Sequence, residues 1–173
     1  MRRHEVTKPV AGVLDAEGAR ILDKLVQARR WDLYTESFED EGHFAEYLDA
    51  TGGGLMWAAA RALGGEDEAA FRIVGRASAL AKLFLAVPRL ESAGRKPLVD
   101  GRESAIRVLA GKALNDVMTT PPPKAGRAAA LAAWRARALL ARAQSDPGRV
   151  ARGDLAESEF NRRWRLITAG WSV

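Results

Sequence analysis

The sequence contains no cysteine and only two histidines, His4 and His43. Disulfide bonds are therefore excluded, and a zinc site is not expected, because cysteine and histidine are the usual zinc ligands. No apolar run approaches the roughly 18 residues of a membrane-spanning helix. The first residues, MRRHEVTKPV, also lack the apolar segment of a signal peptide. These absences predict a cytoplasmic protein.

The familiar catalytic motifs are missing as well. The run Gly52–Gly54 has neither the preceding strand nor the Gly-Lys-Ser/Thr ending of a phosphate-binding loop. Trp57 stands where a dinucleotide-binding motif would need its third glycine. We find no Ser-His-Asp set and no helical pair of aspartates suited to magnesium. The residues therefore indicate no catalytic group and no metal ligand.

What the sequence does contain is helical periodicity along most of its length. Apolar residues recur at helical spacing over about 15–31, 40–63, 66–88, 103–117 and 127–144, and Phe160, Trp164, Ile167 and Trp171 form a last stripe. Pro88 is expected to end or kink the third segment. The pattern predicts an all-α bundle of about six helices in one domain, 1–173. The proline-rich stretch 119–126 should separate the helices of 15–117 from those of 127–171.

The three consecutive glycines lie inside the segment 40–63. A glycine within a helix costs about 1 kcal/mol relative to alanine, so a run of three needs a structural reason. The run therefore predicts a helix that is bent or that lies very close to a neighbouring helix.

Positive charge gathers in the C-terminal third of the chain. The net charge is +5, but the residues from Pro121 onward contain ten basic and four acidic side chains. Basic helices of this kind bind anionic lipid or nucleic acid, or serve as solvated surfaces.

Three stretches carry a family resemblance. In residues 25–64 we note Asp32, Tyr47, Gly53, Leu55 and Met56, and the other two stretches are GRASALAKLFLAVPRLESAGRKPL and EFNRRWRLITAGW. Their order and spacing resemble the squalene/phytoene synthase family, the head-to-head branch of the isoprenyl diphosphate synthases. The resemblance runs from about Val13 onward and implies a helical bundle similar to part of the isoprenoid synthase fold.

The resemblance also shows what this chain lacks. Active members carry a second aspartate-rich motif, whose aspartate positions are here Ala86 and Leu90 and whose arginine position is Leu85; Gly94-Arg95 remains in register. The family's N-terminal helices, with the first aspartate-rich motif, are expected to be missing too. Magnesium needs oxygen ligands, which alanine and leucine do not offer. The resemblance therefore implies a protein that does not catalyse prenyl condensation and needs no cofactor.

Three functions remain open. The first is a non-catalytic member of the family that binds an apolar, isoprenoid-like ligand or acts as an assembly or scaffold factor. The second is an active prenyltransferase of the phytoene or squalene synthase type, which would require magnesium. The third is a basic helical module that binds anionic lipid or, less expectedly, nucleic acid.

A ligand pocket is expected where the second and third predicted helices face each other. The alternative is that the same residues are structural caps, a kink and a surface ion pair. A chain without the family's first helices should also expose apolar surface, which favours a protein partner, a second copy of the chain, or peripheral contact with a membrane. The candidate pocket residues are Asp32, Tyr47, Thr51, Gly53, Met56, Lys82, Phe84 and Arg95.

Overall fold

The structure, a computed structural model, describes residue 5 and residues 7–170, and most of these residues are helical. No strand occurs among these residues, so the predicted all-α fold is confirmed. Two 3-10 helices, η1 and η3, and one π-helical segment, η2, accompany the α-helices. The elements in chain order are α1 (Thr7–Val13), α2 (Ala16–Arg29), η1 (Arg30–Leu33), α3 (Glu41–Leu48), η2 (Asp49–Gly53), α4 (Gly54–Ala62), α5 (Glu68–Ser92), α6 (Glu103–Thr119), η3 (Arg127–Ala133), α7 (Ala136–Ser145), α8 (Gly148–Arg152) and α9 (Glu159–Gly170).

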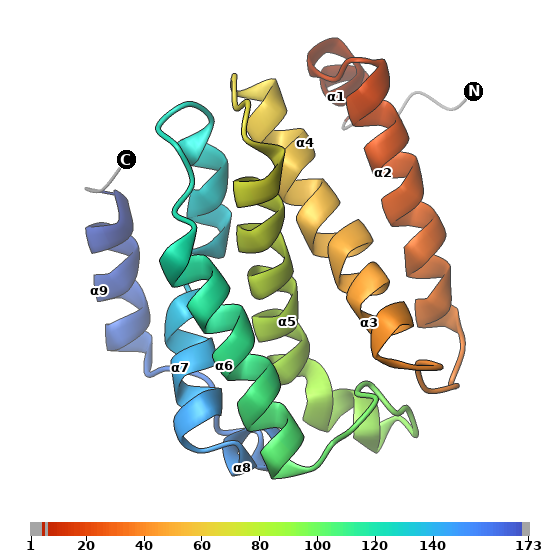
Figure 1. The fold of residues 1–173 in the computed structure, drawn as a ribbon, viewed down its shortest axis with the longest axis vertical. Helices are drawn as coiled ribbons and strands as arrows, with labels where there is room; N and C mark the ends of the chain where they lie inside the picture. The colour runs from red at the N-terminus through yellow and green to blue at the C-terminus, as the bar shows by residue number, and fades with distance from the viewer. Residues whose placement is uncertain (1–4, 6, 171–173) are drawn as a thin grey trace.

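The longest helix, α5, lies at the centre of the bundle. Figure 1 shows α5 between the α3–α4 pair on one side and α6 on the other, with α2 at one edge and α9 at the opposite edge. The elements η2, α4, α6 and α7 all pack against α5. Its apolar stripe is wide because it meets neighbours on several sides, and its two phenylalanines, Phe71 and Phe84, are fully buried.

Aspartate side chains begin three of the helices. Asp15, Asp40 and Asp67 precede α2, α3 and α5, and each accepts a hydrogen bond from the backbone N–H three residues later, at 2.8, 2.8 and 3.0 Å. Each bond satisfies an N–H that has no partner within the helix, and the carboxylate charge also favours the positive end of the helix dipole. The polar stretches between the apolar segments therefore set where these helices start.

The segment 127–144 does not form the single α-helix that its alanine-rich pattern predicts. It begins as the 3-10 helix η3, which follows Gly126 in the left-handed conformation, and only then continues as α7. η3 packs against α4 and α5 through Ala129 and Ala133, both of which are buried. Alanine permits either type of helix, so packing against distant elements decides the outcome here.

Pro88 does not end its helix, because α5 continues to Ser92. Proline removes only one backbone donor from the helix. The chain leaves the helix instead two residues after Ser92, at Gly94, whose φ is +78°. The Gly94 N–H donates to the Glu91 carbonyl at 2.9 Å, in a turn that favours glycine because no side chain opposes the positive φ.

The two ends of the chain add elements that periodicity did not indicate. The short helices α1 and α8 were not predicted, whereas residues 120–126, within the proline-rich stretch, form the connection from α6 to η3. The last apolar stripe lies on α9, with Phe160, Trp164 and Ile167. His4 and Trp171 lie outside the described residues.

Candidate functional site

The glycine run forms the junction between α3 and α4, where the backbone widens into the π-segment η2. The Gly54 N–H donates to the carbonyl of Asp49, five residues earlier, and the Thr51 hydroxyl donates to the carbonyl of Tyr47 at 2.6 Å. A π-segment inserts one extra residue into a helix and often occurs at functional sites. The wider turn shifts the helix face from this point onward.

The same junction touches the backbone of α5. A Cβ atom at Gly52 would lie 2.5 Å from both the Gly75 carbonyl oxygen and the Ala79 Cβ, and a Cβ atom at Gly75 would overlap the Gly52 carbonyl. Only two glycines permit this approach. The prediction that the glycine run marks a close helix contact is confirmed, with Gly75 as the partner position.

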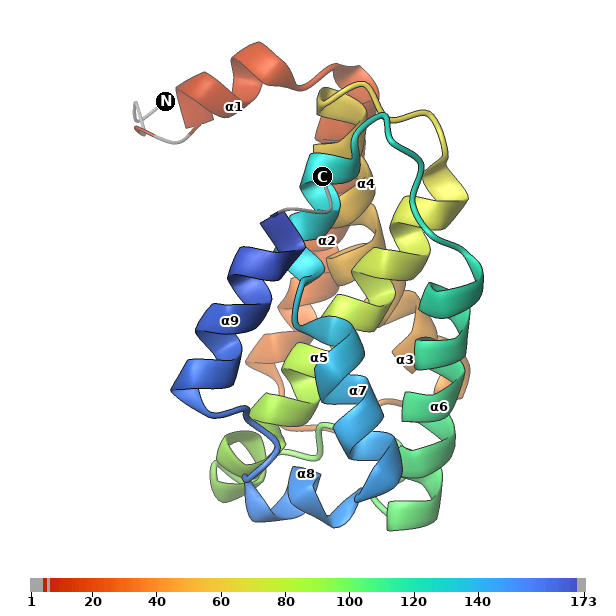
Figure 2. The same cartoon turned by 90° about the vertical axis from the view of Figure 1, so that its left-hand side faces the viewer.

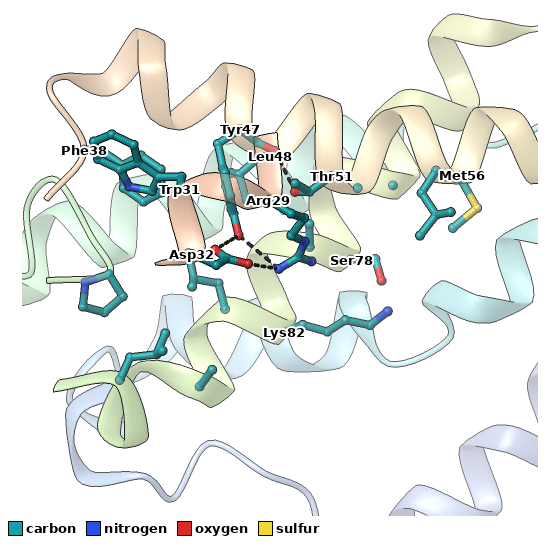
Figure 3. Close-up of a pocket in the computed structure, with 18 of the residues that line it drawn as sticks. Arg29, Trp31, Asp32, Phe38, Tyr47, Leu48, Thr51, Met56, Ser78 and Lys82 are labelled. Atoms are coloured by element: carbon teal, nitrogen blue, oxygen red, sulfur yellow. Dashed lines mark hydrogen bonds and ion pairs between the residues drawn. The ribbon is translucent and has the colours of Figure 1, made fainter. Parts of the chain in front are cut away.

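Beside this contact lies a cavity of about 410 Å³ (Figure 3). Its walls come from the end of α2, η1, the segment between η1 and α3, and from α3, η2, α4, α5 and η3, together with the segment after α5. More than half of the lining residues are apolar, and those from η3 are small. The apolar lining residues are Trp31, Phe38, Leu48, Leu55, Met56, Ala59, Ala79, Leu83, Ala86, Leu90, Pro97, Ala129 and Ala132.

Most of the predicted pocket residues lie together in this cavity. The lining includes Asp32, Tyr47, Thr51, Met56, Lys82 and Arg95. Two predicted members do not line it. A Cβ atom at Gly53 would face the Asp49 carboxylate and the backbone of α5 rather than the cavity. Gly52 lines the cavity instead, because the π-segment changes which residue faces inward. Phe84 is fully buried in the core, on another side of α5.

Sequence reasoning missed several lining residues. On α5 the inward face carries Gly75, Ser78, Ala86 and Arg89 in addition to Lys82. Spacings of three and four residues connect these positions, so this small and polar face was a signal within the sequence. Arg29 and Lys96 come from segments outside α5, and no local sequence pattern indicates that their side chains line the same cavity.

The cavity lining holds a hydrogen-bonded polar cluster of Arg29, Asp32 and Tyr47, drawn in Figure 3. The Tyr47 hydroxyl donates to Asp32 Oδ1 at 2.7 Å, and Arg29 Nη1 lies 2.9 Å from Asp32 Oδ2 and 3.1 Å from the Tyr47 oxygen. Burial, and then the hydrogen bond to Asp32, raise the pKa of Tyr47 to about 12, against the lowering effect of the Arg29 charge. The cluster is therefore a neutral tyrosine beside a compensated ion pair.

Other cations around the cavity lack such compensation. Five basic residues line it, against two acidic ones, Asp32 and Glu36. Among the described residues, the side chains of Lys82, Arg89 and Lys96 are exposed at the rim of the cavity and have no hydrogen-bond or ion-pair partner within the protein. The basic lining residues are Arg29, Lys82, Arg89, Arg95 and Lys96. The cavity therefore combines an apolar wall with excess positive charge, which suits an anionic group attached to an apolar chain.

A second hollow lies between α2, α3, η2, α5 and α6 and has a volume of about 580 Å³. Its central charges are paired with one another, since the Asp49 carboxylate accepts from Arg72 at 2.6 Å and from Arg76 at 3.0 Å. A ligand would have to displace these contacts. The first cavity is therefore the better candidate for a binding site.

In the described part of the chain, no three His, Asp or Glu side chains are grouped so that they could hold a metal ion. Over the same residues, no helix is both long enough and apolar enough to cross a membrane. The sequence matches no protein-family model, and neither the curated proteins nor the solved structures contain a significant match.

Proposed function

We propose that this protein binds an amphiphilic, isoprenoid-like molecule without transforming it. The apolar chain of the ligand would occupy the cavity between α3–α4, α5 and η3, and an anionic head would lie near Lys82, Arg89 and Lys96. The single observation that carries the proposal is the pairing of an apolar cavity of about 410 Å³ with these uncompensated cations. The volume is in the range of small-molecule sites.

The apolar and the basic lining residues of the cavity supply different parts of the affinity. Each buried CH₂ group of a ligand contributes about 0.8 kcal/mol, so an apolar wall selects for a hydrocarbon chain. A hydrogen bond to a charged group contributes about 1.5–3 kcal/mol. Lys82 lies on α5 in the middle of the lining, so we expect it to contribute most directly to holding the head group.

Binding without catalysis is supported by where the carboxylates lie. Ala86 and Leu90 stand at the positions that the family resemblance aligns with metal-binding aspartates. Both residues line the cavity, and their side chains have no oxygen that could bind a metal ion. The Asp32 carboxylate is held by Tyr47 and Arg29. Loss of a diphosphate group requires stabilisation of the charge that develops on it, which metal ions provide in such reactions. We therefore propose a carrier or sensor of the ligand rather than a synthase.

The test separates the contribution of the ligand's anionic head group to binding from that of its apolar chain. Farnesyl diphosphate and farnesol are titrated by calorimetry, in EDTA, into the wild-type protein and Lys82→Met. Lys112→Met, an exposed lysine in the middle of α6, is the matched control. We expect Lys82→Met to weaken diphosphate binding about tenfold or more, to leave farnesol binding unchanged, and the control to match wild type.

A second measurement addresses catalysis directly. The protein is incubated with farnesyl and geranylgeranyl diphosphate and magnesium, and the diphosphate released is compared with that in a protein-free control. We expect no release above the control. Magnesium-dependent release would contradict the proposal and support the prenyltransferase alternative.

A further inference from the structure

The C-terminal helix α9 is set apart from the bundle. Figures 1 and 2 show it at the outer edge in both views, after the turn that follows α8. Within the described residues α9 packs extensively against no other element. The bundle core is formed by the preceding helices, so α9 presents much of its surface to the surroundings.

One face of α9 is apolar and open. Phe160, Trp164 and Ile167 follow one another at spacings of four and three residues, which places them on the same side of a helix. These side chains are 76%, 60% and 53% exposed. Three large apolar side chains exposed on one helix face form a patch of the kind that marks interaction sites, unlike exposed apolar residues that are scattered singly.

The charge of α9 indicates what the face meets. The helix contains three arginines and one glutamate, within a C-terminal third that carries ten basic and four acidic residues. Arg163 is 77% exposed and has Glu159, 3.3 Å away, as its ion-pair partner. A short helix with aromatic and aliphatic residues on one face and arginines elsewhere suits the interface of an anionic membrane. A second copy would bring like charges together, and an exposed face of three large apolar side chains matches an acyl layer better than the charged backbone of a nucleic acid.

We propose that α9 is a docking element for membranes that contain anionic phospholipids. The helix lies parallel to the surface, with Phe160, Trp164 and Ile167 at the boundary of head groups and acyl chains and Arg163 beside them at the level of the phosphates. Its 12 residues span about 18 Å, too short to cross a bilayer. The proposal is independent of the ligand suggested for the cavity.

The test uses the full chain and vesicles of phosphatidylcholine, with or without about 30% phosphatidylglycerol, at low salt. Co-sedimentation of wild type is compared with the double variant Phe160→Ser with Trp164→Ser. The matched control is Val108→Ser with Met118→Ser, which removes two exposed apolar side chains from α6. Circular dichroism confirms that all the proteins are folded.

We expect wild type to bind the anionic vesicles, the α9 variant to bind at least about tenfold more weakly, and the α6 variant to match wild type. Arg163→Gln should weaken binding by a few-fold at low salt, and the difference should shrink at high salt. Equal binding by the α9 variant and wild type would overturn the proposal. The proposal would also be overturned if wild type did not bind anionic vesicles and the α9 substitutions instead abolished dimerisation, measured by light scattering, or binding to DNA.

Discussion

Replacing Gly75 with alanine is expected to destabilise the protein, although alanine is normally the better residue within a helix. The new methyl group would lie 2.7 Å from both the Gly52 carbonyl carbon and the Met56 Cβ, and closer still to the Gly52 oxygen. None of these atoms is at the end of a flexible side chain. The contact is relieved only if α5 moves away from η2, and these two elements pack closely.

The size of the effect follows from two opposing terms. Forcing an extra methyl group into a packed site costs about 1–3 kcal/mol, and contact with backbone on one side favours the upper part of that range. Replacing a helical glycine recovers about 1 kcal/mol. The expected net loss for Gly75→Ala is about 2 kcal/mol, which lowers the Tm of a chain of this size by roughly 4–8 °C.

Urea unfolding followed by circular dichroism measures the loss, and Gly111→Ala is the matched control. Gly111 lies within α6, where a new Cβ would meet the terminal amide of Gln144 at 2.8 Å. That side chain can move aside, so we expect Gly111→Ala to be neutral or to stabilise by up to about 1 kcal/mol. If Gly75→Ala proves as stable as Gly111→Ala, the close contact between α5 and η2 does not exist.

The remaining predictions concern one tyrosine, one aspartate and one phenylalanine. The phenolate absorbance of Tyr47, taken as the difference between wild type and Tyr47→Phe, should titrate near pH 12 because burial and the hydrogen bond to Asp32 raise its pKa. Its contribution to stability should accordingly be complete below about pH 10 and disappear between pH 10 and 12, as urea midpoints would show. The Arg61 side chain lowers the pKa of Asp15 from 3.8 to about 2, so wild type should lose its advantage in Tm over Asp15→Asn as the pH falls from about 4 to 2; a constant difference would contradict this. Phe84→Ala should cost about 3–5 kcal/mol in urea unfolding because the ring is fully buried, whereas the same change at the exposed phenylalanine of α9 should cost almost nothing.

The helices could be predicted because their signals are local. The spacing of apolar residues predicted α5 and α6 closely, and the aspartates before α2, α3 and α5 mark their starts. The same method was right for α7 but wrong for the first part of 127–144, where alanines allow both α and 3-10 geometry and the segment that packs against α4 and α5 is the 3-10 helix η3. It also left open whether Pro88 ends its helix, which the turn at Gly94 does instead.

The candidate site was predictable only in part. Asp32, Tyr47 and Lys82 do line one cavity, but the prediction placed Gly53 and Phe84 there as well. The π-segment shifts the inward face by one residue, and nothing in the local pattern distinguishes an α-turn from a π-turn. The wide apolar stripe of α5 likewise does not say which of its residues face the core and which face the cavity.

By itself, the sequence determined that the chain is helical, that its glycine run marks a bend or a close helix contact, and that positive charge gathers toward the C-terminal end. These properties depend on residue type and on neighbours three or four positions away. Only the tertiary structure decided that Gly75 is the partner of Gly52, and that Lys96, from the loop after α5, joins Lys82 and Arg29 around one cavity. Contacts between residues distant in the sequence depend on how the helices pack, and packing is a property of the whole bundle rather than of any one stretch of the chain.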